Sequence, residues 1–372
     1  MFFIGMLIFV IASIAVTYKI LTGYASVSIL SKVCVLLFLV ISWFTPVWLR
    51  FIRKGPDFLS GSFYEIVYKL GYFMMGFVLV LTMLLIFRDI VWHIVYLLSK
   101  SEKLNPNNAY HINLLNMITL LLSFLISLYG VYEAHKIPQV KNVYVADERI
   151  KEPVKFVVAS DFHINRSTPK FHINKIIDTI NEQNPDYILL VGDIVDDDPK
   201  YAHEKFKILT ALKAKKIYIT LGNHEFYNKP YAWMIEFAKE GFEILHNTGE
   251  KLEKEGVYVA GIPDVGTTDV NYDKAFLYAN ADEYKILLSH SPADFNEVDK
   301  TRFDIQFSGH THGGQIFPFQ YITKKANAGY LEGLYKTENA DLFVMHGAGY
   351  WGPPMRIGAA PDIAVLTLEP KK

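Results

Sequence analysis

The sequence predicts an N-terminal bundle of four membrane-spanning helices followed by an α/β domain. The first third of the 372-residue chain holds four long runs without a charged residue. From about residue 154, short apolar runs alternate with polar helical stretches. The mean hydropathy of +0.18 is high for a soluble protein, and the first third accounts for the excess. We therefore expect a transmembrane region at 1–140, a linker at 141–153 and an α/β domain at 154–372.

The four uncharged runs are the candidate spans, at 1–18, 33–49, 70–87 and 112–132. A helix that crosses a bilayer needs roughly 20 mostly apolar residues, and each run reaches that length with its uncharged flanks. Four buried core helices are the alternative, but they would leave too little polar surface in this part of the chain to cover them. A cleaved signal peptide is an alternative for the first run only. That run lacks a charged n-region and a clean cleavage site, so we predict an uncleaved helix.

Lysine and arginine in the short loops predict the orientation, because cytoplasmic loops carry an excess of them. One side of the predicted bundle has six such residues: Arg50, Arg53, Lys54, Lys69, Lys136 and Lys141. The other side has four: Lys19, Lys32, Lys100 and Lys103. This bias favours both termini and the C-terminal domain on the cytoplasmic side. We expect a multi-pass protein of a bacterial inner (plasma) membrane.

Charge and cysteine content exclude two classes of protein. The formal net charge is −1 and the pI about 6.9, whereas nucleic-acid binding needs concentrated basic charge. We therefore expect no nucleic acid as a partner, whereas the uncharged runs predict the lipid bilayer as one. The single cysteine, Cys34, excludes an intramolecular disulfide framework. The sequence does not specify an oligomeric state.

In the second domain, five apolar runs each end in polar residues, at 154–163, 187–193, 217–225, 284–290 and 303–312. Helical patterns intervene at 174–183, 201–212 and 230–239. Continuous apolar strands between helices are typical of sheets buried on both faces. Ligands of such sheets bind beyond the carboxyl ends of the strands, so we expect the polar ends to converge. The pattern does not distinguish one open sheet from two packed sheets.

The converging side chains are carboxylates, imidazoles and one amide: Asp161, His163, Asp193, Asn223, His224, His290, His310 and His312. Oxygen and imidazole ligands without cysteine suit Mn, Fe or Zn. Seven or eight ligands exceed one tetrahedral ion and suit two divalent ions that share a carboxylate. Each residue alone has an ordinary interpretation, such as an aspartate at a helix N-cap or an asparagine in a turn. Their common location favours the metal site.

The spacing of two residues within DFH and HTH supports this interpretation. Residues two apart in an extended segment point the same way, so His310 and His312 are expected to face the metals together while Thr311 points away. Asp161 and His163 have the same spacing. The glycines beside HTH permit tight turns and a close approach of the backbone.

The order of these motifs resembles the calcineurin-like metallophosphoesterase superfamily: DFH at 161–163, GD at 192–193, GNHE at 222–225, His290 and GHTH at 309–312. The forms GHTHGGQ at 309–315 and YWGPPMRIGAAPDIAVLTL at 350–368 resemble its YkuE-type membrane-associated branch. The resemblance covers nearly all of the second domain but not the four uncharged runs. It implies a β-sandwich of two mixed sheets flanked by helices.

The resemblance also implies how the residues divide between two ions. One ion would be bound by Asp161, His163 and His312. The other would be bound by Asn223, His290 and His310, with Asp193 bridging the two. His224 would not be a ligand but the general acid, or a group that stabilises the phosphoryl oxygens.

Four further residues are candidates for supporting the ligands or contacting substrate. Glu225 stands where most members of the superfamily have aspartate, and we expect it to orient His224. Arg166 and Arg356 could each bind a phosphate or form a surface ion pair. His346 could contact substrate or be a plain loop histidine.

We expect the protein to hydrolyse a phosphate ester or anhydride with water that two divalent ions activate, while His224 protonates the leaving oxygen. The membrane region favours a lipid-linked or nucleotide-linked substrate, such as a phospholipid, an isoprenoid diphosphate or UDP-2,3-diacylglucosamine, the last by analogy with the superfamily. A manganese-dependent phosphodiesterase of lipid metabolism would fit. The preference among monoester, diester and pyrophosphate is not specified.

Two alternatives belong to other classes. One is a catalytically weak metal-binding scaffold or regulator of a membrane partner, which should lack a ligand or His224. The other is a transporter with an accessory soluble domain, which should carry charges inside its spans. The candidates for such charges, Arg88, Asp89 and His93, lie near the end of a run.

Overall fold

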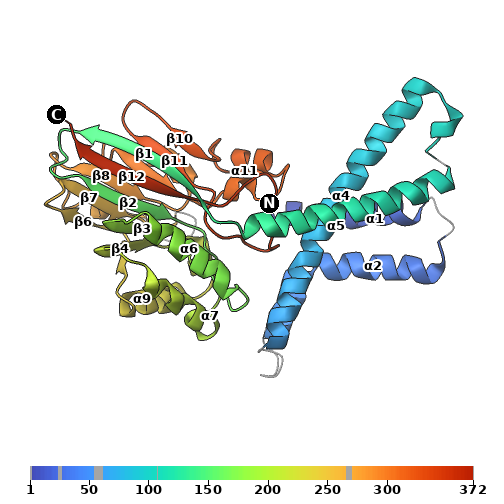
Figure 1. Ribbon diagram of the computed structural model, residues 1–372, viewed down its shortest axis with the longest axis horizontal. Helices are drawn as coiled ribbons and strands as arrows, with labels where there is room; N and C mark the ends of the chain where they lie inside the picture. The colour runs from blue at the N-terminus through green and yellow to red at the C-terminus, as the bar shows by residue number, and fades with distance from the viewer. Residues whose placement is uncertain (1, 24–26, 54–61, 107, 265–269, 372) are drawn as a thin grey trace. The chain divides into compact units, whose positions relative to one another are not determined.

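The computed structural model describes residues 2–23, 27–53, 62–106, 108–264 and 270–371, and it divides into two compact units (Figure 1). The helical unit comprises Met1–Tyr132 with the short segment Gly352–Met355. The α/β unit comprises Glu133–Trp351 and Arg356–Lys372. The predicted fold class, apolar helices followed by an α/β domain, is confirmed.

The helical unit contains five α-helices among its described residues: α1 (Phe2–Thr22), α2 (Ile29–Trp43), α3 (Thr45–Arg53), α4 (Ser62–Ser99) and α5 (Ala109–Ala134). By length and composition, α1, α4 and α5 could each cross a bilayer. The pair α2 and α3 is bent by 70° and counts as a fourth candidate if it forms one span. The second predicted span is therefore bent, since Pro46 lacks the N–H that would continue the helix. Lys54, used for the orientation, lies outside the described residues.

Polar side chains inside the helical unit bond to one another. Thr17 Oγ1 of α1 lies 2.7 Å from Thr82 Oγ1 of α4. Arg88 of α4 forms an ion pair with its neighbour Asp89 and donates to Asn116 Oδ1 of α5 over 2.7 Å. In the hydrocarbon core of a bilayer, polar side chains find no water to form hydrogen bonds with. Hydrogen bonds between helices would therefore stabilise the helical unit there.

The first sheet of the α/β unit has the strand order β1-β12-β2-β3-β4-β5. Its strands are β1 (Gln139–Asp147), β12 (Asp362–Pro370), β2 (Val154–Ala159), β3 (Tyr187–Val191), β4 (Lys216–Thr220) and β5 (Glu243–Ile244). β12 runs antiparallel to β2, and the other neighbours are parallel. The sheet is therefore mixed.

The second sheet has the order β10-β11-β9-β8-β7-β6. Its strands are β10 (Gly333–Tyr335), β11 (Asp341–Val344), β9 (Ile305–Ser308), β8 (Tyr284–Leu288), β7 (Val257–Gly261) and β6 (Thr248–Leu252). The four central strands are parallel, and both edge strands, β10 and β6, are antiparallel to their neighbours. This sheet is mixed as well.

The two sheets pack face to face, which the alternation of side chains along each strand shows. Phe156 and Val158 of β2 lie in one core cluster with Ile286 and Leu288 of β8. Val157, the residue between them, belongs to a different cluster beneath the helices. Because side chains alternate between the faces of a strand, the first cluster fills the space between the sheets. The implied sandwich of two mixed sheets is confirmed.

Helices α6 (Lys170–Glu182), α7 (Pro199–Phe206) and α9 (Pro230–Lys239) cover the outer face of the first sheet (Figure 1). α6 buries Ile173, Ile176, Ile177 and Ile180, a spacing that gives one apolar face. The outer face of the second sheet is covered by α10 (Tyr272–Ala275) and the short helix η4 (Pro292–Asn296). All three helical patterns predicted in this domain correspond to helices.

The predicted linker at 141–153 is wrong for most of its length, because residues 141–147 belong to β1. This strand pairs in parallel with β12 along all nine residues, from Gln139 to Asp147. It is an edge strand with alternating polar residues, and only Val143 is buried. A half-exposed strand without an apolar run gives little signal in the sequence. The α/β unit thus begins before β1, and any variant lacking 139–147 would expose β12.

Buried His172 of α6 predicts a specific acid sensitivity. Both of its ring nitrogens are buried without a hydrogen-bond partner. Burial, and then the nearby charges of His135, Arg356 and Lys175, lower the pKa of His172 to about 3. Below pH 6.5 the unfolded chain binds a proton that the folded chain does not, so stability falls as pH falls from about 6.5 towards 3.

We expect His172→Leu to remove this contribution, which reaches about 1.4 kcal/mol per pH unit at most. Urea unfolding of the full chain at pH 6.5 and pH 4.5 would measure it. The wild type should lose more stability over this interval than the variant. Equal losses in the two proteins would show that His172 does not stay neutral in the folded state.

Candidate metal centre

The polar ends of five strands converge at one edge of the sandwich. The eight predicted residues are distributed as follows: Asp161 and His163 after β2, Asp193 after β3, Asn223 and His224 after β4, His290 after β8, His310 and His312 after β9. Backbone hydrogen bonds continue beyond the strands: Asp161 N donates to Gly192 O, and Gly309 N donates to His290 O, each over 3.0 Å. Both sheets therefore contribute to one cluster.

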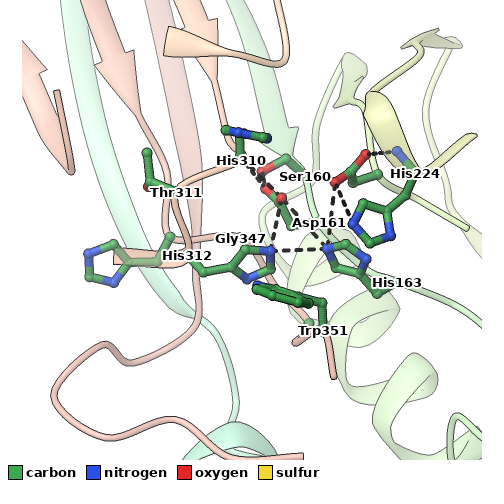
Figure 2. Close-up of polar contacts among 12 residues, drawn as sticks. Ser160, Asp161, His163, His224, His310, Thr311, His312, Gly347 and Trp351 are labelled. Carbon is green, nitrogen blue, oxygen red and sulfur yellow. Dashed lines mark hydrogen bonds and ion pairs between the residues drawn. The ribbon is translucent and has the colours of Figure 1, made fainter. Parts of the chain in front are cut away.

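Asp161, His163 and His312 form the first group of potential ligands. His312 Nε2 lies 3.2 Å from Asp161 Oδ1 and 3.0 Å from His163 Nε2 (Figure 2). His163 Nε2 is 3.8 Å from the same oxygen, Asp161 Oδ1. All three residues are buried. These are the three residues that the resemblance assigns to one ion.

Asp193, His290 and His310 form a second group. His290 Nε2 lies 3.1 Å from Asp193 Oδ2. Asn223 joins the group through its Oδ1 atom, which is 3.0 Å from His310 Nδ1. The side chains assigned to the other ion therefore lie together as well.

Asp193 lies between the two groups. Its Oδ2 atom is 3.7 Å from His163 Nε2 and 3.1 Å from His290 Nε2. It also belongs to a third group, with His163 and His224. A carboxylate in this position can serve two ions, as a bridging ligand must.

The donor atoms fit divalent metal ions. His290 Nδ1 lies 2.8 Å from the carbonyl of Val191, which as an acceptor fixes the ring proton on Nδ1. The Nε2 atom of His290 is buried and faces Asp193 Oδ2 over 3.1 Å, so it points into the cluster. Burial lowers the pKa of His290, but the charges of Asp193 and Asp161 outweigh it and raise the pKa well above its usual value, so a metal would displace the proton on Nε2. The Nε2 atoms of His163 and His312 point at each other over 3.0 Å. Two neutral imidazole lone pairs so close repel unless a proton or a cation lies beside them.

Five of the candidate ligands have left-handed backbone conformations, with positive φ: Asp161 (56°), His163 (49°), Asp193 (53°), His310 (69°) and His312 (51°). Such conformations cost non-glycine residues about 1–3 kcal/mol each and cluster at functional sites. Strand alternation is therefore not what turns HTH and DFH toward the proposed metals, although Asp161 and His163 do join one group as expected. These residues lie beyond the strands, where left-handed turns aim them. His310 and His312 consequently join different groups.

Two glycines allow the backbone to approach the carboxylates closely. A Cβ atom on Gly309 would collide with the side chains of Ser160 and Asp161. A Cβ atom on Gly222 would collide with the side chain of Asp193. The glycines of GHTH and GNHE are thus needed because the two aspartates occupy the space of a side chain.

Burial and mutual charge keep most of the cluster in ligand-ready protonation states. Burial raises the pKa of Asp161, but His312 and His290 overcome this and hold the pKa below its usual value. Burial lowers the pKa of His163, His310 and His312. Carboxylates that are ionised and imidazoles that are neutral are the forms that bind metal.

Asp196 orients His224, a role that the sequence predicts for Glu225. Asp196 Oδ1 lies 2.6 Å from His224 Nδ1. Burial lowers the pKa of His224, but the charges of Asp196 and Asp193 outweigh it and raise the pKa to about 10. The only sequence signal for Asp196 is its position three residues after Asp193 in GDIVD. Metal ions beside Asp193 would oppose this rise in pKa.

Glu225 supports the backbone rather than His224. Its carboxylate accepts from the backbone N–H groups of Asp193, Ile194, Val195 and Gly222, over 2.7–2.9 Å. It is fully buried. Glu225 therefore fixes the loop that presents Asp193, and the predicted contact with His224 is replaced by that of Asp196.

The two arginines are already engaged by the protein. Arg166 forms a buried ion pair with Asp197, with 2.7 Å between Nε and Oδ2. Its guanidinium lies over the ring of Tyr201, 3.5 Å from the centroid. Arg356 is fully buried and donates to several backbone carbonyls, including that of His312. The predicted surface ion pairs are therefore wrong for both residues.

His346 lies near the GHTHGGQ turn. Its Nδ1 atom is 2.8 Å from the carbonyl of Ala360, and its Nε2 atom contacts Glu332. A Cβ atom on Gly313 would collide with this ring. These contacts agree with the interpretation of His346 as a loop histidine, and a contact with substrate stays a prediction.

Known proteins resemble this chain over both units. The calcineurin-like phosphoesterase family matches residues 154–314. A metallophosphoesterase of Campylobacter jejuni is 30% identical over 391 aligned positions, which cover 100% of this chain and 98% of that protein. The metallophosphoesterase YkuE of Bacillus subtilis is 30% identical over 58% of this chain and 79% of its own length. A transmembrane protein with metallophosphoesterase domain from Danio rerio is 28% identical over 68% of this chain and 62% of its own length.

Proposed function

Because the chain belongs to the calcineurin-like metallophosphoesterases, which are metal-dependent hydrolases, we propose that it cleaves a phosphate ester or pyrophosphate bond in a lipid-linked or nucleotide-linked substrate at a membrane. The observation that carries this proposal is the convergence of seven side chains from both sheets into adjoining groups of potential metal ligands, with Asn223 beside His310. A phospholipid and UDP-2,3-diacylglucosamine are examples of the proposed substrate.

We propose two divalent ions, of Mn, Fe or Zn, in these groups. Asp161, His163 and His312 would hold one, while Asn223, His290 and His310 would hold the other. Asp193 would serve both, as its position between the groups supports. When bound, two such ions lower the pKa of water and neutralise charge that develops on the phosphoryl oxygens.

His224 supplies the proton for the leaving oxygen in this proposal. Its Nδ1 atom is held by Asp196, which fixes the ring and stabilises its protonated form. Its Nε2 atom lies 4.0 Å from Asp193 Oδ2, beside the proposed metal site. The backbone N–H of His224 donates to Asp193 Oδ1 over 2.9 Å, which ties the acid to the shared carboxylate.

Metal-dependent hydrolysis by the full chain tests the proposed activity. The chain would be reconstituted in lipid nanodiscs, stripped with a chelator and assayed with bis(4-nitrophenyl) phosphate and 4-nitrophenyl phosphate. We expect turnover to return with Mn²⁺, and the ratio of the two rates to separate diesterase from monoesterase activity. Folded protein that binds metal but turns over neither substrate would favour the alternative of a scaffold or regulator.

His224→Gln distinguishes a proton donor from a metal ligand, because His224 also belongs to one group of potential ligands. We expect the variant to keep its metal content and to lose about 100-fold or more in kcat for alkyl leaving groups, a usual contribution of general acid catalysis. The loss should be smaller for 4-nitrophenol, which leaves without a proton. Loss of an ion from the variant would make His224 a ligand instead.

The proposed location is a bacterial inner membrane, with several spans and the α/β unit on the cytoplasmic side. The three or four candidate spans and the transmembrane relatives support membrane association. The excess of lysine and arginine in alternate loops supports the orientation. A C-terminal fusion to alkaline phosphatase should stay inactive in cells, and an active fusion would reverse the proposed orientation.

The lipid-linked class of substrate rests on this membrane association. Phospholipid or isoprenoid diphosphate in vesicles and soluble nucleotides would be offered to the same preparation. We expect the vesicle substrates to be cleaved with the higher kcat/KM. Cleavage of soluble nucleotides alone would contradict the lipid-linked class while leaving the phosphoesterase activity intact.

A further inference from the structure

Two exposed aromatic side chains flank His224, the proposed proton donor. The ring centroid of Tyr227 lies 5.5 Å from that of His224, and the ring of Trp351 lies 6.4 Å from it. The tyrosine is 69% exposed and the tryptophan 50% exposed. They come from distant parts of the chain, Tyr227 from α8 (Asn223–Tyr227) and Trp351 from the loop between β11 and β12 (Figure 2 draws Trp351). We call Tyr227 and Trp351 the aromatic rim.

The backbone of Trp351 is held in place by one side chain, that of Gln315. Gln315 Nε2 donates to Trp351 O over 2.9 Å, and Trp351 N donates to Gln315 Oε1 over 3.2 Å. The amide of Gln315 thus forms both bonds that a neighbouring strand would form. Gln315 is buried and has a positive φ of 53°, which is uncommon for a residue with a side chain. The conformation of Gln315 is costly, and it fixes the peptide of Trp351 while the indole stays exposed. This arrangement is explained if the indole of Trp351 binds a partner from solution.

Three described cations near the cluster are each bound by other groups of the protein. Arg166 pairs with Asp197, and Arg356 is enclosed by carbonyl groups. Lys229, two residues after Tyr227, pairs with Asp198 over 2.6 Å. These three cations are thus each paired or enclosed, whereas the two side chains of the aromatic rim are exposed beside His224. Aromatic surface beside a polar centre is the usual lining of a site for an apolar ligand group.

We propose that the aromatic rim binds an apolar group attached to the leaving oxygen of the substrate, and that Gln315 positions Trp351 for this contact. This inference rests on the proposed phosphoesterase function and on His224 as the acid on the leaving side. The substrate class is a phosphate ester or anhydride whose leaving group has an apolar face close to the oxygen. An acyl or alkyl group and a planar base share this chemistry. The membrane association favours the acyl or alkyl group.

Competitive inhibition of bis(4-nitrophenyl) phosphate hydrolysis measures this contact in the full chain in nanodiscs, without detergent. The inhibitors are methylphosphonate, octylphosphonate and phenylphosphonate, which share the phosphoryl group and differ in the apolar part. Burying several methylenes should make the inhibition constant of octylphosphonate about 30-fold lower than that of methylphosphonate in the wild type. The ratio of the two constants is the readout.

Variants test whether the aromatic rim causes the difference between the two inhibition constants. We expect Tyr227→Ala with Trp351→Ala to lower the ratio to about threefold, and Trp351→Phe to keep most of it. Gln315→Met, which keeps the size but lacks both hydrogen bonds, should lower the ratio as well. Tyr231→Ala is the matched control, because Tyr231 is 78% exposed and no described ring contact joins it to the cluster. Variants that weaken both phosphonates equally would show a general disturbance of the site and would contradict the rim.

The outcomes separate this inference from the proposed function. If the protein turns over substrate but neither octylphosphonate nor phenylphosphonate inhibits more strongly than methylphosphonate, the aromatic rim is overturned. The proposed phosphoesterase function is then unaffected. If only phenylphosphonate inhibited more strongly than methylphosphonate, the result would support the aromatic rim. It would overturn the acyl or alkyl group as its ligand, in favour of a planar base. Absence of metal-dependent turnover in the wild type would overturn the proposed function and this inference with it.

Discussion

Replacing Asp193 by asparagine is expected to lower phosphoester turnover by more than about 100-fold, since changing even the partners behind a metal ligand costs about 10- to 100-fold. Asp193 Oδ2 lies 3.7 Å from His163 Nε2 of the first group and 3.1 Å from His290 Nε2 of the second. Asp161 Oδ1 reaches the second group only at 3.9 Å, also from His290 Nε2. Its burial would raise its pKa, but His290 and His224 hold the pKa well below its usual value. The neutral amide cannot replace this charge.

The backbone at position 193 should survive the change. Its N–H is bound by Glu225, and the neighbouring N–H groups are bound by the same carboxylate. Metal content per chain, measured after dialysis against Mn²⁺, should fall together with turnover while the unfolding midpoint stays close to that of the wild type. Asp178→Asn on the exposed face of α6 is the matched control and should retain both properties. A variant at Asp193 that keeps full metal content and turnover would remove this residue from the centre.

The strands that carry the cluster could be predicted because their apolar runs are local. The run at 187–193 contains β3 (Tyr187–Val191), and the run at 284–290 contains β8 (Tyr284–Leu288). β1 was mistaken for a linker because it is stabilised by a partner, β12, that lies more than 200 residues away in the chain. Whether two sheets pack depends on which face each strand turns to the other, and no single run contains that information.

Within the site, residue types could be predicted but their conformations could not. The histidines of HTH were expected to align through strand alternation, yet left-handed turns direct them to different groups. Asp196 was missed because an aspartate three residues after Asp193 is an unremarkable turn residue in sequence. Arg356 was expected near the surface, since arginine is rarely fully buried. Its burial depends on carbonyl groups that only the folded loops bring together.

Arg356 organises the loops around His312. Its guanidinium donates to the carbonyls of His346, Gly347 and Gly349, over 2.6–3.0 Å. It also donates to the carbonyl of His312 and lies 3.2 Å from the Nδ1 atom of that ring. Burial lowers the pKa of Arg356 to about 10, which still leaves it charged at neutral pH. One planar group with five N–H donors thus satisfies carbonyls that face one another in a buried space.

Arg356→Met is expected to destabilise the α/β unit by about 3 kcal/mol or more, because each buried acceptor left unsatisfied costs about 1–3 kcal/mol. Arg356→Lys should lose much of the same stability, since a single ammonium cannot reach carbonyls on several sides. Urea unfolding of the full chain would measure both changes.

The matched control for Arg356 is Arg302→Met. Arg302 forms an ion pair with the largely exposed Asp273, and such surface pairs contribute only about 0–1 kcal/mol. Metal affinity gives a second readout, because the loss of Arg356 should loosen His312 and weaken binding by the group that contains Asp161. An Arg356→Met protein that unfolds at the wild-type urea concentration and keeps its metal would show that the loops around His312 are held by the sandwich itself.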